Sequence, residues 1–422
     1  MTSLPSQQIS LNLFKKKMRH SRFSIYRYNK DQTPISQYGD VKHYRSLVVD
    51  ASKEPEALVC PSPVRSMSLK DFSHSVDNAN IFYEEIIDGV MINLFFDKEE
   101  NKWLMATRSE VGGKNKFYLD TSAKTFGELF ADGCRACELD LDTSKCPLPQ
   151  QYQYSFVLEH PEHRIVRPVA EPRLYLVEAY EILDPVKKDV RTININDKSE
   201  PIYQELEKIS KLRYPRMLSF KSPEDLQRVM KQGKHPYHFA GVMAKDYQNS
   251  RRMKVRNPVY EDVKQLRGNH SKKQYLYLTL RQNGNLSTYL KYYPEDGDVF
   301  QKYRAQLHEF TDKCYNFYVE CFIKKKQHVK EYPEQYKMVM TQLHTMYLKN
   351  YVDNKGFIAK QDVIGLINKM PPARQMYLLN YELRNFVKEQ VAVETQQALD
   401  IEREKYNPPK TSDGQPMKIF HK

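Results

Sequence analysis

Cationic side chains on strand-like segments are the residues of this sequence most able to do chemistry. Arg45 precedes the apolar run 47–49, and Lys254 and Arg256 alternate along another β-prone segment. Alternate residues of a strand share one face, so these two charges would lie together. A guanidinium pairs readily with phosphate, although a solvated strand edge would carry the same residues. The sequence holds 66 Lys and Arg against 53 Asp and Glu, a net charge of +13. That excess suggests a polyanionic partner, nucleic acid more often than a membrane, unless it serves solubility alone.

The pair Asp88-Gly89 interrupts an apolar stretch that runs from Tyr83 to Phe96. An Asp-Gly pair between two β-prone runs is typical of a tight turn. We therefore predict a buried strand pair here, with Asp88 and Gly89 as its turn. Taken alone, such a pair marks a hairpin more often than a site.

Cysteines offer a second kind of chemistry. Cys134 and Cys137 are spaced as zinc ligands are, and Cys146 follows them. A structural zinc site needs a fourth ligand, which His160 or His163 would supply only if the fold returns them to this place. Scattered thiols are the alternative interpretation. Six cysteines in 422 residues are too few for a disulfide scaffold, which favours an intracellular, reducing compartment.

Antiparallel strands must position most of these residues. Short β-prone runs alternate with polar turns through the first 260 residues, a pattern typical of hairpin-connected sheets. A helix is predicted near 125–130, and another begins after Ser222, which has Pro and acidic residues in the following turn. The predicted strands are 46–50, 81–83, 90–96, 103–107, 154–158, 174–180, 238–245 and 252–256.

The pattern changes after about residue 265. Apolar residues recur at three- and four-residue spacing from Leu307 to Cys321, which predicts an amphipathic helix, and further helices are predicted over 336–349 and 373–397. Tyrosines flank the turn at Asn283-Gly284, where packing is favoured over base stacking. The predicted fold class is therefore α+β. Its predicted parts are a basic N-terminal arm over 1–40, a strand-rich domain over 41–265, a helical domain over 266–407 and a tail over 408–422.

Targeting signals are not evident in the sequence. Residues 1–20 contain no apolar core of a secretory signal, and no run approaches the length of a spanning helix. With 40% hydrophobic residues the chain can bury a sizeable core. We expect a folded intracellular protein, in the cytoplasm or a viral replication compartment, without a membrane partner or an evident obligate protein partner.

The strand-associated polar residues, taken in chain order, resemble the motifs of the RNA ligases of bacteriophages and large DNA viruses, which repair cleaved tRNA. The resembling segments are Tyr44 to Asp50 (an arginine motif), Cys60 to Arg65 (a proline-bearing motif), Ile86 to Gly89 (the Lys-x-Asp-Gly nucleophile motif), Phe156 to Val166 (an acidic strand followed by Arg-Ile-Val), Ala240 to Asp246 (the Glu-Gly motif) and Met253 to Tyr260 (the final lysine motif). Each motif is weak by itself, and six in order are more specific.

This resemblance implies an antiparallel, ATP-grasp-like nucleotidyltransferase domain followed by a helical domain. Family members form a covalent lysyl-AMP from ATP with the help of Mg²⁺, then join RNA 3′-hydroxyl and 5′-phosphate ends. The nucleotide-binding residues that it implies for this sequence are Arg45, Asp88, Gly89, Arg108, Lys254 and Arg256.

The departures from the family pattern fall on its chemical positions. Ile86 stands at the nucleophilic lysine and has no lone pair with which to attack, and the sequence shows no lysine nearby. Val157 and Ala240 stand at the two acidic positions. Glu159 lies two residues after Val157, on the same strand face, and is a possible substitute. Val64 replaces a lysine of the proline-bearing motif.

These departures predict a catalytically impaired pseudo-ligase that binds RNA ends or nucleotide. An active RNA ligase with a displaced lysine nucleophile is the alternative, and a capping-type guanylyltransferase or a DNA ligase is more remote. If no nucleotide binds, Ile86 and Val157 are ordinary strand core residues.

Overall fold

The computed structural model describes residues 13–18, 21–29, 44–73, 80–118, 122–350 and 356–406. The chain divides into two compact units, Met1–Ser271 and Lys272–Lys422. The predicted tail over 408–422 lies outside the described residues, as does most of the predicted arm over 1–40. The unit boundary falls a few residues after the predicted boundary at 265.

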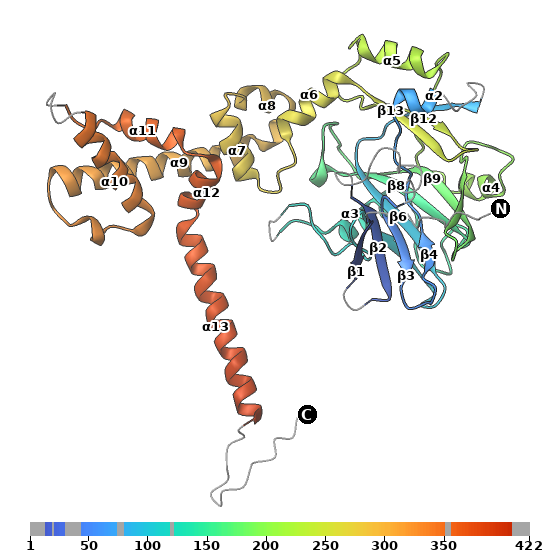
Figure 1. Cartoon of the computed structure of the whole chain (residues 1–422), viewed down its shortest axis with the longest axis horizontal. Helices are drawn as coiled ribbons and strands as arrows, with labels where there is room; N and C mark the ends of the chain where they lie inside the picture. The colour runs from blue at the N-terminus through green and yellow to red at the C-terminus, as the bar shows by residue number, and fades with distance from the viewer. Residues whose placement is uncertain are drawn as a thin grey trace, which may run out of the picture. The chain divides into compact units, whose positions relative to one another are not determined.

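The described residues of unit 1 form three antiparallel sheets, the first of which begins inside the predicted arm (Figure 1). Its strand order is β1-β2-β3-β4. Strand β1 lies at the sheet edge and carries three consecutive lysines, which suits an edge because charge discourages pairing with another chain. The bounds are β1 Leu13–Lys17, β2 Phe23–Tyr28, β3 Leu47–Asp50 and β4 Ala57–Cys60.

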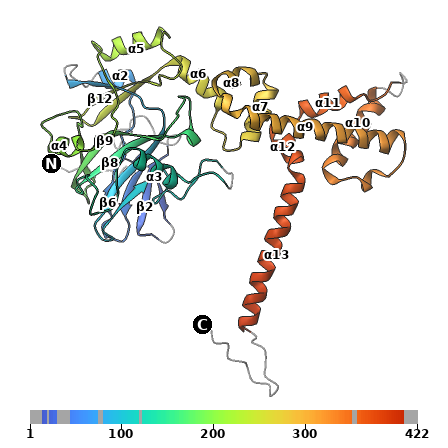
Figure 2. The ribbon, with the colours of Figure 1, turned by 180° about the vertical axis from the view of Figure 1, so that it is seen from behind.

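The second sheet has the order β10-β9-β8-β6-β7. Helix α3 packs on one face, where its Leu129 and Phe130 join a core that includes Phe156 of β8 (Figure 2). This helix is the one predicted near residue 125, and Thr125 and Glu128 form its capping box. The bounds are β6 Val90–Asp97, β7 Lys102–Ala106, α3 Phe126–Ala136, β8 Tyr152–Glu159, β9 Arg173–Asp184 and β10 Asp189–Ile193, followed by α4 Pro201–Glu207.

The third sheet has the order β11-β5-β12-β13. Helices α2 and α5 cover one of its faces, where Phe72, Leu226 and Met230 pack on Tyr83 (Figure 1). Ser222 caps α5 as predicted, and β12 and β13 form the predicted strand pair. The bounds are α2 Leu69–Ser73, β5 Phe82–Glu85, β11 Met217–Leu218, α5 Pro223–Lys231, β12 Gly241–Asp246, β13 Arg251–Arg256 and α6 Pro258–Arg267.

The prediction of a hairpin at Asp88-Gly89 is wrong. Strand β5 pairs with β11 and β12 in the third sheet, whereas β6 pairs with β7 and β8 in the second. Residues 86–89 therefore carry the chain from one sheet to another. Long-range pairing decides this, because each strand finds its neighbours far away in the sequence, where the local Asp-Gly signal has no influence.

Unit 2 is helical, so the α+β class is confirmed. Leu307, Phe310 and Cys314 are buried along α9, as the amphipathic pattern predicts, and Tyr277 and Tyr289 pack in the core. The bounds are α7 Lys273–Gln282, α8 Leu286–Tyr292, α9 Gly297–Tyr318, α10 Glu334–Asn350, α11 Lys360–Lys369, α12 Pro372–Leu379 and α13 Tyr381–Tyr406.

The helix predicted over 373–397 is interrupted at Asn380, between α12 and α13. The Asn380 side-chain amide donates a hydrogen bond to Gln274 at 2.6 Å and accepts one from it at 3.3 Å. The Leu379 carbonyl accepts one from Gln306 at 3.1 Å. These bonds hold the break against α7 and α9. No helix among the described residues is long and apolar enough to cross a membrane.

Candidate phosphate-binding site

The second face of the third sheet carries charged residues instead of a hydrophobic core. Glu84 on β5 and Lys254 on β13 both pair with Met243 of the intervening strand β12. The side chains of Lys245 and Arg252 leave the same face and reach Glu178 on β9 of the second sheet. The charged face of the third sheet therefore meets the second sheet.

A buried ion-pair network joins these two sheets. Lys245 Nζ lies 2.7 Å from Glu84 Oε2 and 3.7 Å from Glu178 Oε1, and Arg252 lies 2.9 Å from Glu178. The Tyr247 hydroxyl donates to Glu84 at 2.8 Å. Burial favours the neutral acid, but Arg252 and Lys245 hold the pKa of Glu178 below its usual value. Both carboxylates of the network are thus committed to buried cations.

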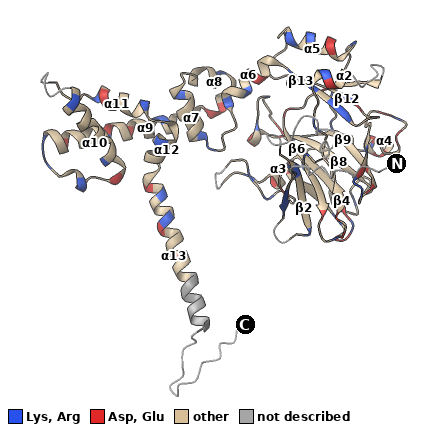
Figure 3. Ribbon diagram, in the orientation of Figure 1, with Lys and Arg blue, Asp and Glu red and all other residues tan. Residues whose placement is uncertain are grey.

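Arg45, Arg108 and Lys254 form a different kind of group beside this network. All three are exposed, and none lies within 4.0 Å of a carboxylate in the described part of the chain. Arg45 is exposed, although its guanidinium group is partly buried among protein atoms. That burial, with Arg252 and Arg108 nearby, lowers its pKa to about 10. We call these three residues the cation cluster, and Figure 3 shows the Lys and Arg positions along the ribbon.

Lys254 is the lysine of the cation cluster, and its pKa is strongly lowered. Burial of its ammonium group, together with the charges of Arg256, Arg45 and Arg252, lowers its pKa to about 8. Arg256 shares its strand face, as predicted, but lies 3.5 Å from Glu261 and is therefore partly neutralised. The cluster thus concentrates positive charge, and no described carboxylate lies within ion-pair distance of its three members.

A serine brings two members of the cluster together. The Ser46 hydroxyl, at the start of β3, lies within hydrogen-bond distance of the Thr107 carbonyl at 3.3 Å and the Arg108 carbonyl at 3.1 Å. This contact ties the residue after Arg45 to the segment after β7. Arg45 and Arg108 therefore act on one another although 63 residues separate them in the sequence.

Asp88 has protein partners on both of its carboxylate oxygens. One oxygen accepts hydrogen bonds from the Val166 and Arg167 backbone N–H groups, each at 2.9 Å, and the other accepts from the Tyr260 hydroxyl. The carboxylate anchors the crossover between the sheets to α6 and to the segment after β8. Its predicted part in nucleotide binding stays a prediction.

Gly89 is required by the packing of the crossover against β8. A Cβ at this position would lie 2.2 Å from the Leu158 carbonyl oxygen, far inside a permitted contact. Glycine is therefore favoured here because the backbone of residue 89 lies very close to the backbone of β8.

Apolar packing fills the positions at which the resemblance places the nucleophile and the metal-binding acids. Val157 is buried in a cluster with Tyr175 and Val177, against which Ile87 packs. Ala240 is also buried, and Ile86 is half-buried. The Ile86 N–H donates to the Gly241 carbonyl at 2.9 Å, so the third sheet extends one residue past β5.

Glu159 is buried with one oxygen 3.4 Å from Arg167, and its other oxygen has no partner in the described part of the chain. Burial raises its pKa, Arg167 opposes this shift, and Asp88 adds to it. A carboxyl group in this environment takes up a proton more readily than an ordinary glutamate, which weakens it as a ligand for Mg²⁺.

The residues present do not fit the magnesium that the resemblance implies. Glu84 and Glu178 are held by Lys245 and Arg252, and Asp88 already accepts three protein hydrogen bonds. Hard cations need several free oxygen ligands. Around the cation cluster, the described carboxylates do not offer such a set.

The zinc prediction finds no support among the described residues. Their one group with metal-ligand geometry is Asp132, His160 and Glu162, and Lys124 already lies 3.0 Å and 2.6 Å from its two acids. Neither ring nitrogen of His163 has a hydrogen-bond partner there, and burial lowers its pKa to about 4.

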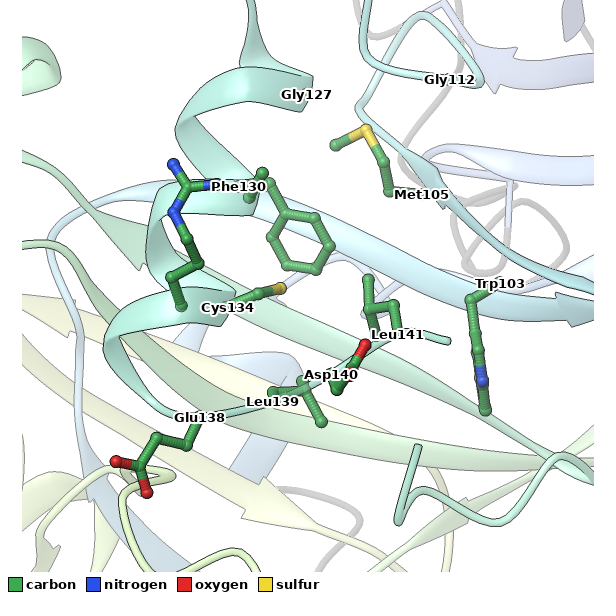
Figure 4. Close-up of a pocket in the computed structure, with 12 residues that line it drawn as sticks. Trp103, Met105, Gly112, Gly127, Phe130, Cys134, Glu138, Leu139, Asp140 and Leu141 are labelled. Atoms are coloured by element: carbon green, nitrogen blue, oxygen red, sulfur yellow. The ribbon is translucent and has the colours of Figure 1, made fainter. Parts of the chain in front are cut away.

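The three cysteines proposed as zinc ligands are free thiols. Cys134 lines a cavity of about 690 Å³ with Trp103, Met105 and Phe130 (Figure 4). This cavity lies on the α3 side of the second sheet, whereas the next residue after Phe156, Val157, packs on the other side. It is therefore separate from the cation cluster.

Several residues of the site escaped the sequence analysis. Lys245, Glu84, Glu178 and Arg252 were not singled out, although an acid or base inside an apolar strand was a usable signal. No lysine lies near Ile86 along its own strand, but the neighbouring part of the sheet carries two. Lys245 lies on β12, the strand next to β5, and Lys254 lies on β13, the strand that follows β12 in the same sheet.

Comparisons with known proteins give distant similarities. No protein-family model matches the sequence. The immediate-early protein ICP-46 homolog of Invertebrate iridescent virus 6 is 22% identical over 293 residues, which cover 66% of this chain and 61% of that protein. The chain thus spans less than two thirds of the length of this relative.

Solved structures of RNA and DNA ligases are among those similar to this chain. A putative ATP-dependent DNA ligase from Aquifex aeolicus is 16% identical, with a TM-score of 0.37 and coverage of 72% of this chain and 77% of that one. An archaeal ATP-dependent RNA ligase is 14% identical, with a TM-score of 0.35 and coverage of 69% of this chain and 68% of that one. A mutant Naegleria gruberi RNA ligase with ATP and Mn is 8% identical, with a TM-score of 0.35 and coverage of 50% of this chain and 60% of that one.

Proposed function

We propose that unit 1 is a ligase-like binding module that holds the phosphates of an RNA end or a nucleotide and does not carry out adenylyl transfer. The observation that carries this proposal is the cation cluster. Arg45, Arg108 and Lys254 are accessible and lack a described carboxylate partner. In the same unit, Ile86, Val157 and Ala240 stand at the positions where the resemblance places the nucleophile and the metal-binding acids.

The electrostatics of the cluster favour an anion. The lowered pKa values of Arg45 and Lys254 mean that the protein disfavours their charged forms when nothing is bound. A phosphate bound among these side chains offsets the cost of their burial and their mutual repulsion, because it forms charge-assisted hydrogen bonds with them. Phosphate binding here needs no metal, since the cluster itself supplies the positive charge.

The proposed binding module does not catalyse adenylyl transfer, for two reasons. Ile86 offers no nucleophile, and the buried Val157 and Ala240 offer no metal ligand. The nearby carboxylates of Glu84 and Glu178 are bound to cations of the protein. The ligand is therefore retained and released unchanged, as in a scaffold or protective factor for RNA ends. ATP, GTP and tRNA ends are all ligands with phosphates that this cluster suits.

One observation favours a second function, an active RNA ligase with a displaced nucleophile. Lys254 is accessible, and with a pKa of about 8 roughly a tenth of its amine is neutral at neutral pH. Its Nζ would attack the α-phosphorus of ATP, forming a phosphorus–nitrogen bond as pyrophosphate leaves and the amine loses a proton to solvent.

A labelling experiment separates the two functions. Purified protein is incubated with α-labelled ATP and Mg²⁺ or Mn²⁺ and then examined by denaturing electrophoresis. The binding module gives no covalent label, yet binds ATP or a 5′-phosphorylated oligoribonucleotide in EDTA, and Arg45→Gln weakens that binding. A label that survives in Ile86→Ala and disappears in Lys254→Arg would overturn the first function and establish the second.

A further inference from the structure

We propose that the cation cluster continues as a track for a single-stranded polynucleotide, from Lys254 through Arg45 and Arg108 to Arg27, and ends on the exposed ring of Phe14. This inference rests on the proposed function, because it extends the path of an RNA whose end the cluster holds. It adds a second contact region, on the edge of the first sheet, and a minimum length of bound strand.

The connection between the cluster and the sheet edge is electrostatic. Arg27 on β2 is partly buried, and burial together with the charge of Arg108 lowers its pKa. Arg108 in turn acts on Arg45, and Arg45 acts on Lys254. Each cation thus lies within reach of the next. Like the cluster, Arg27 has no carboxylate within 4.0 Å in the part of the chain described, and its buried Nε has no hydrogen-bond partner there.

The register of the first sheet adds an aromatic residue to this row. Phe14 of β1 pairs directly with Arg27 of β2, and the guanidinium lies 5.0 Å from the centre of the Phe14 ring. Phe14 is 53% exposed. Lys16, on the same face of β1, donates a hydrogen bond to the Ser109 carbonyl at 2.9 Å and so ties the edge strand to the segment of Arg108.

A row of cations that ends on an exposed aromatic ring suits a single strand of nucleic acid. The cations follow the phosphates, and a base stacks on the ring. A duplex keeps its bases inside and cannot use Phe14 in this way. The contacts described are to phosphates and base faces, so the shared chemistry is that of single-stranded RNA and DNA, and the sugar is not read.

Strand β1 itself provides a matched control. Lys15 lies next to Lys16 but on the opposite face, where it forms an ion pair with Glu56. Lys15→Gln removes one positive charge from the edge strand without touching the row. Arg27→Gln removes one charge from the row, and Phe14→Ala removes the ring. Arg45→Gln tests the proposed site.

The experiment measures binding of 3′-labelled, 5′-phosphorylated oligouridylates by fluorescence anisotropy in EDTA, for lengths of about two to ten nucleotides. We expect affinity to rise with length and then level off. Arg27→Gln should weaken the long oligomer about three- to tenfold, leave the dinucleotide unchanged and reduce the salt slope by about 0.7. Phe14→Ala should also weaken only the long oligomer, and Lys15→Gln should change neither. Unlabelled single-stranded DNA should compete, and duplex RNA should not.

Several results would overturn the track. They are equal losses in Arg27→Gln and Lys15→Gln, a decamer that binds no tighter than the dinucleotide, an unchanged affinity in Phe14→Ala, or a failure of single-stranded DNA to compete. If the dinucleotide binds and Arg45→Gln abolishes its binding while length adds nothing, the track fails and the proposed function stands. If Arg45→Gln leaves dinucleotide binding intact, the proposed site itself fails.

Discussion

The pH dependence of phosphate binding tests the electrostatics of the cation cluster most directly. Lys254 has a pKa of about 8 in the free protein because protein surrounds its ammonium group and Arg256 and Arg45 lie close by. Only the protonated lysine attracts phosphate, so a bound anion must raise its pKa. The affinity for phosphate is therefore highest below about pH 7 and falls as the pH rises through 8.

The magnitude follows from these values. If the bound anion returns the pKa of Lys254 to its ordinary value of 10.5 or near it, the affinity falls about tenfold between pH 7 and pH 9. This loss corresponds to about 1.4 kcal/mol of binding free energy. The second ionisation of a terminal phosphate, near pH 6, is complete over this range and does not contribute.

Isothermal titration calorimetry at constant ionic strength measures the effect, with a 5′-phosphorylated dinucleotide at pH 7, 8 and 9. Lys254→Arg keeps the charge but does not titrate in this range, so its affinity should stay constant. Affinity that does not change with pH in the natural sequence would refute the reasoning. So would an equal pH slope in Lys254→Arg, since another group would then be responsible.

Three further predictions concern the framework of the site, each measured by thermal or denaturant unfolding of the full chain. Lys245→Met leaves the buried Glu84 without its cation and should destabilise unit 1 by about 3–5 kcal/mol. Adding Glu84→Gln should recover much of this loss, and a double variant no more stable than the single one would contradict the assignment. Gly89→Ala should cost about 1–3 kcal/mol or more, because its Cβ would overlap a backbone oxygen of β8; unchanged stability would show that the crossover can shift. Tyr260→Phe removes one hydrogen-bond donor to Asp88 and should lower the free energy of unfolding by about 1.5–3 kcal/mol. Tyr118→Phe is the control, because the Tyr118 hydroxyl bonds to Arg267 instead. An equal loss in both variants would argue against the role of Tyr260.

Local signals in the sequence predicted much of the fold. Thr125 and Ser222 cap the helices that follow them, since capping depends only on the next few residues. The alternation at Lys254 and Arg256 predicted a shared strand face, because the side-chain period of a strand is also local. The break at Asn380 was not predicted, since its bonds reach α7 and α9.

The sequence by itself determined which residues carry charge and that Ile86 cannot act as a nucleophile, and it predicted many of the strands and helices. Only the tertiary structure decided which of these residues meet. It turned Asp88-Gly89 from an expected hairpin into a crossover between sheets, and it placed Arg45, Arg108 and Lys254 in one cluster. It also bound Glu84 and Glu178 to buried cations, and so removed them as metal ligands. The physical reason is that sheet pairing and ion pairing are made between residues far apart in the chain, and no local period or cap records them.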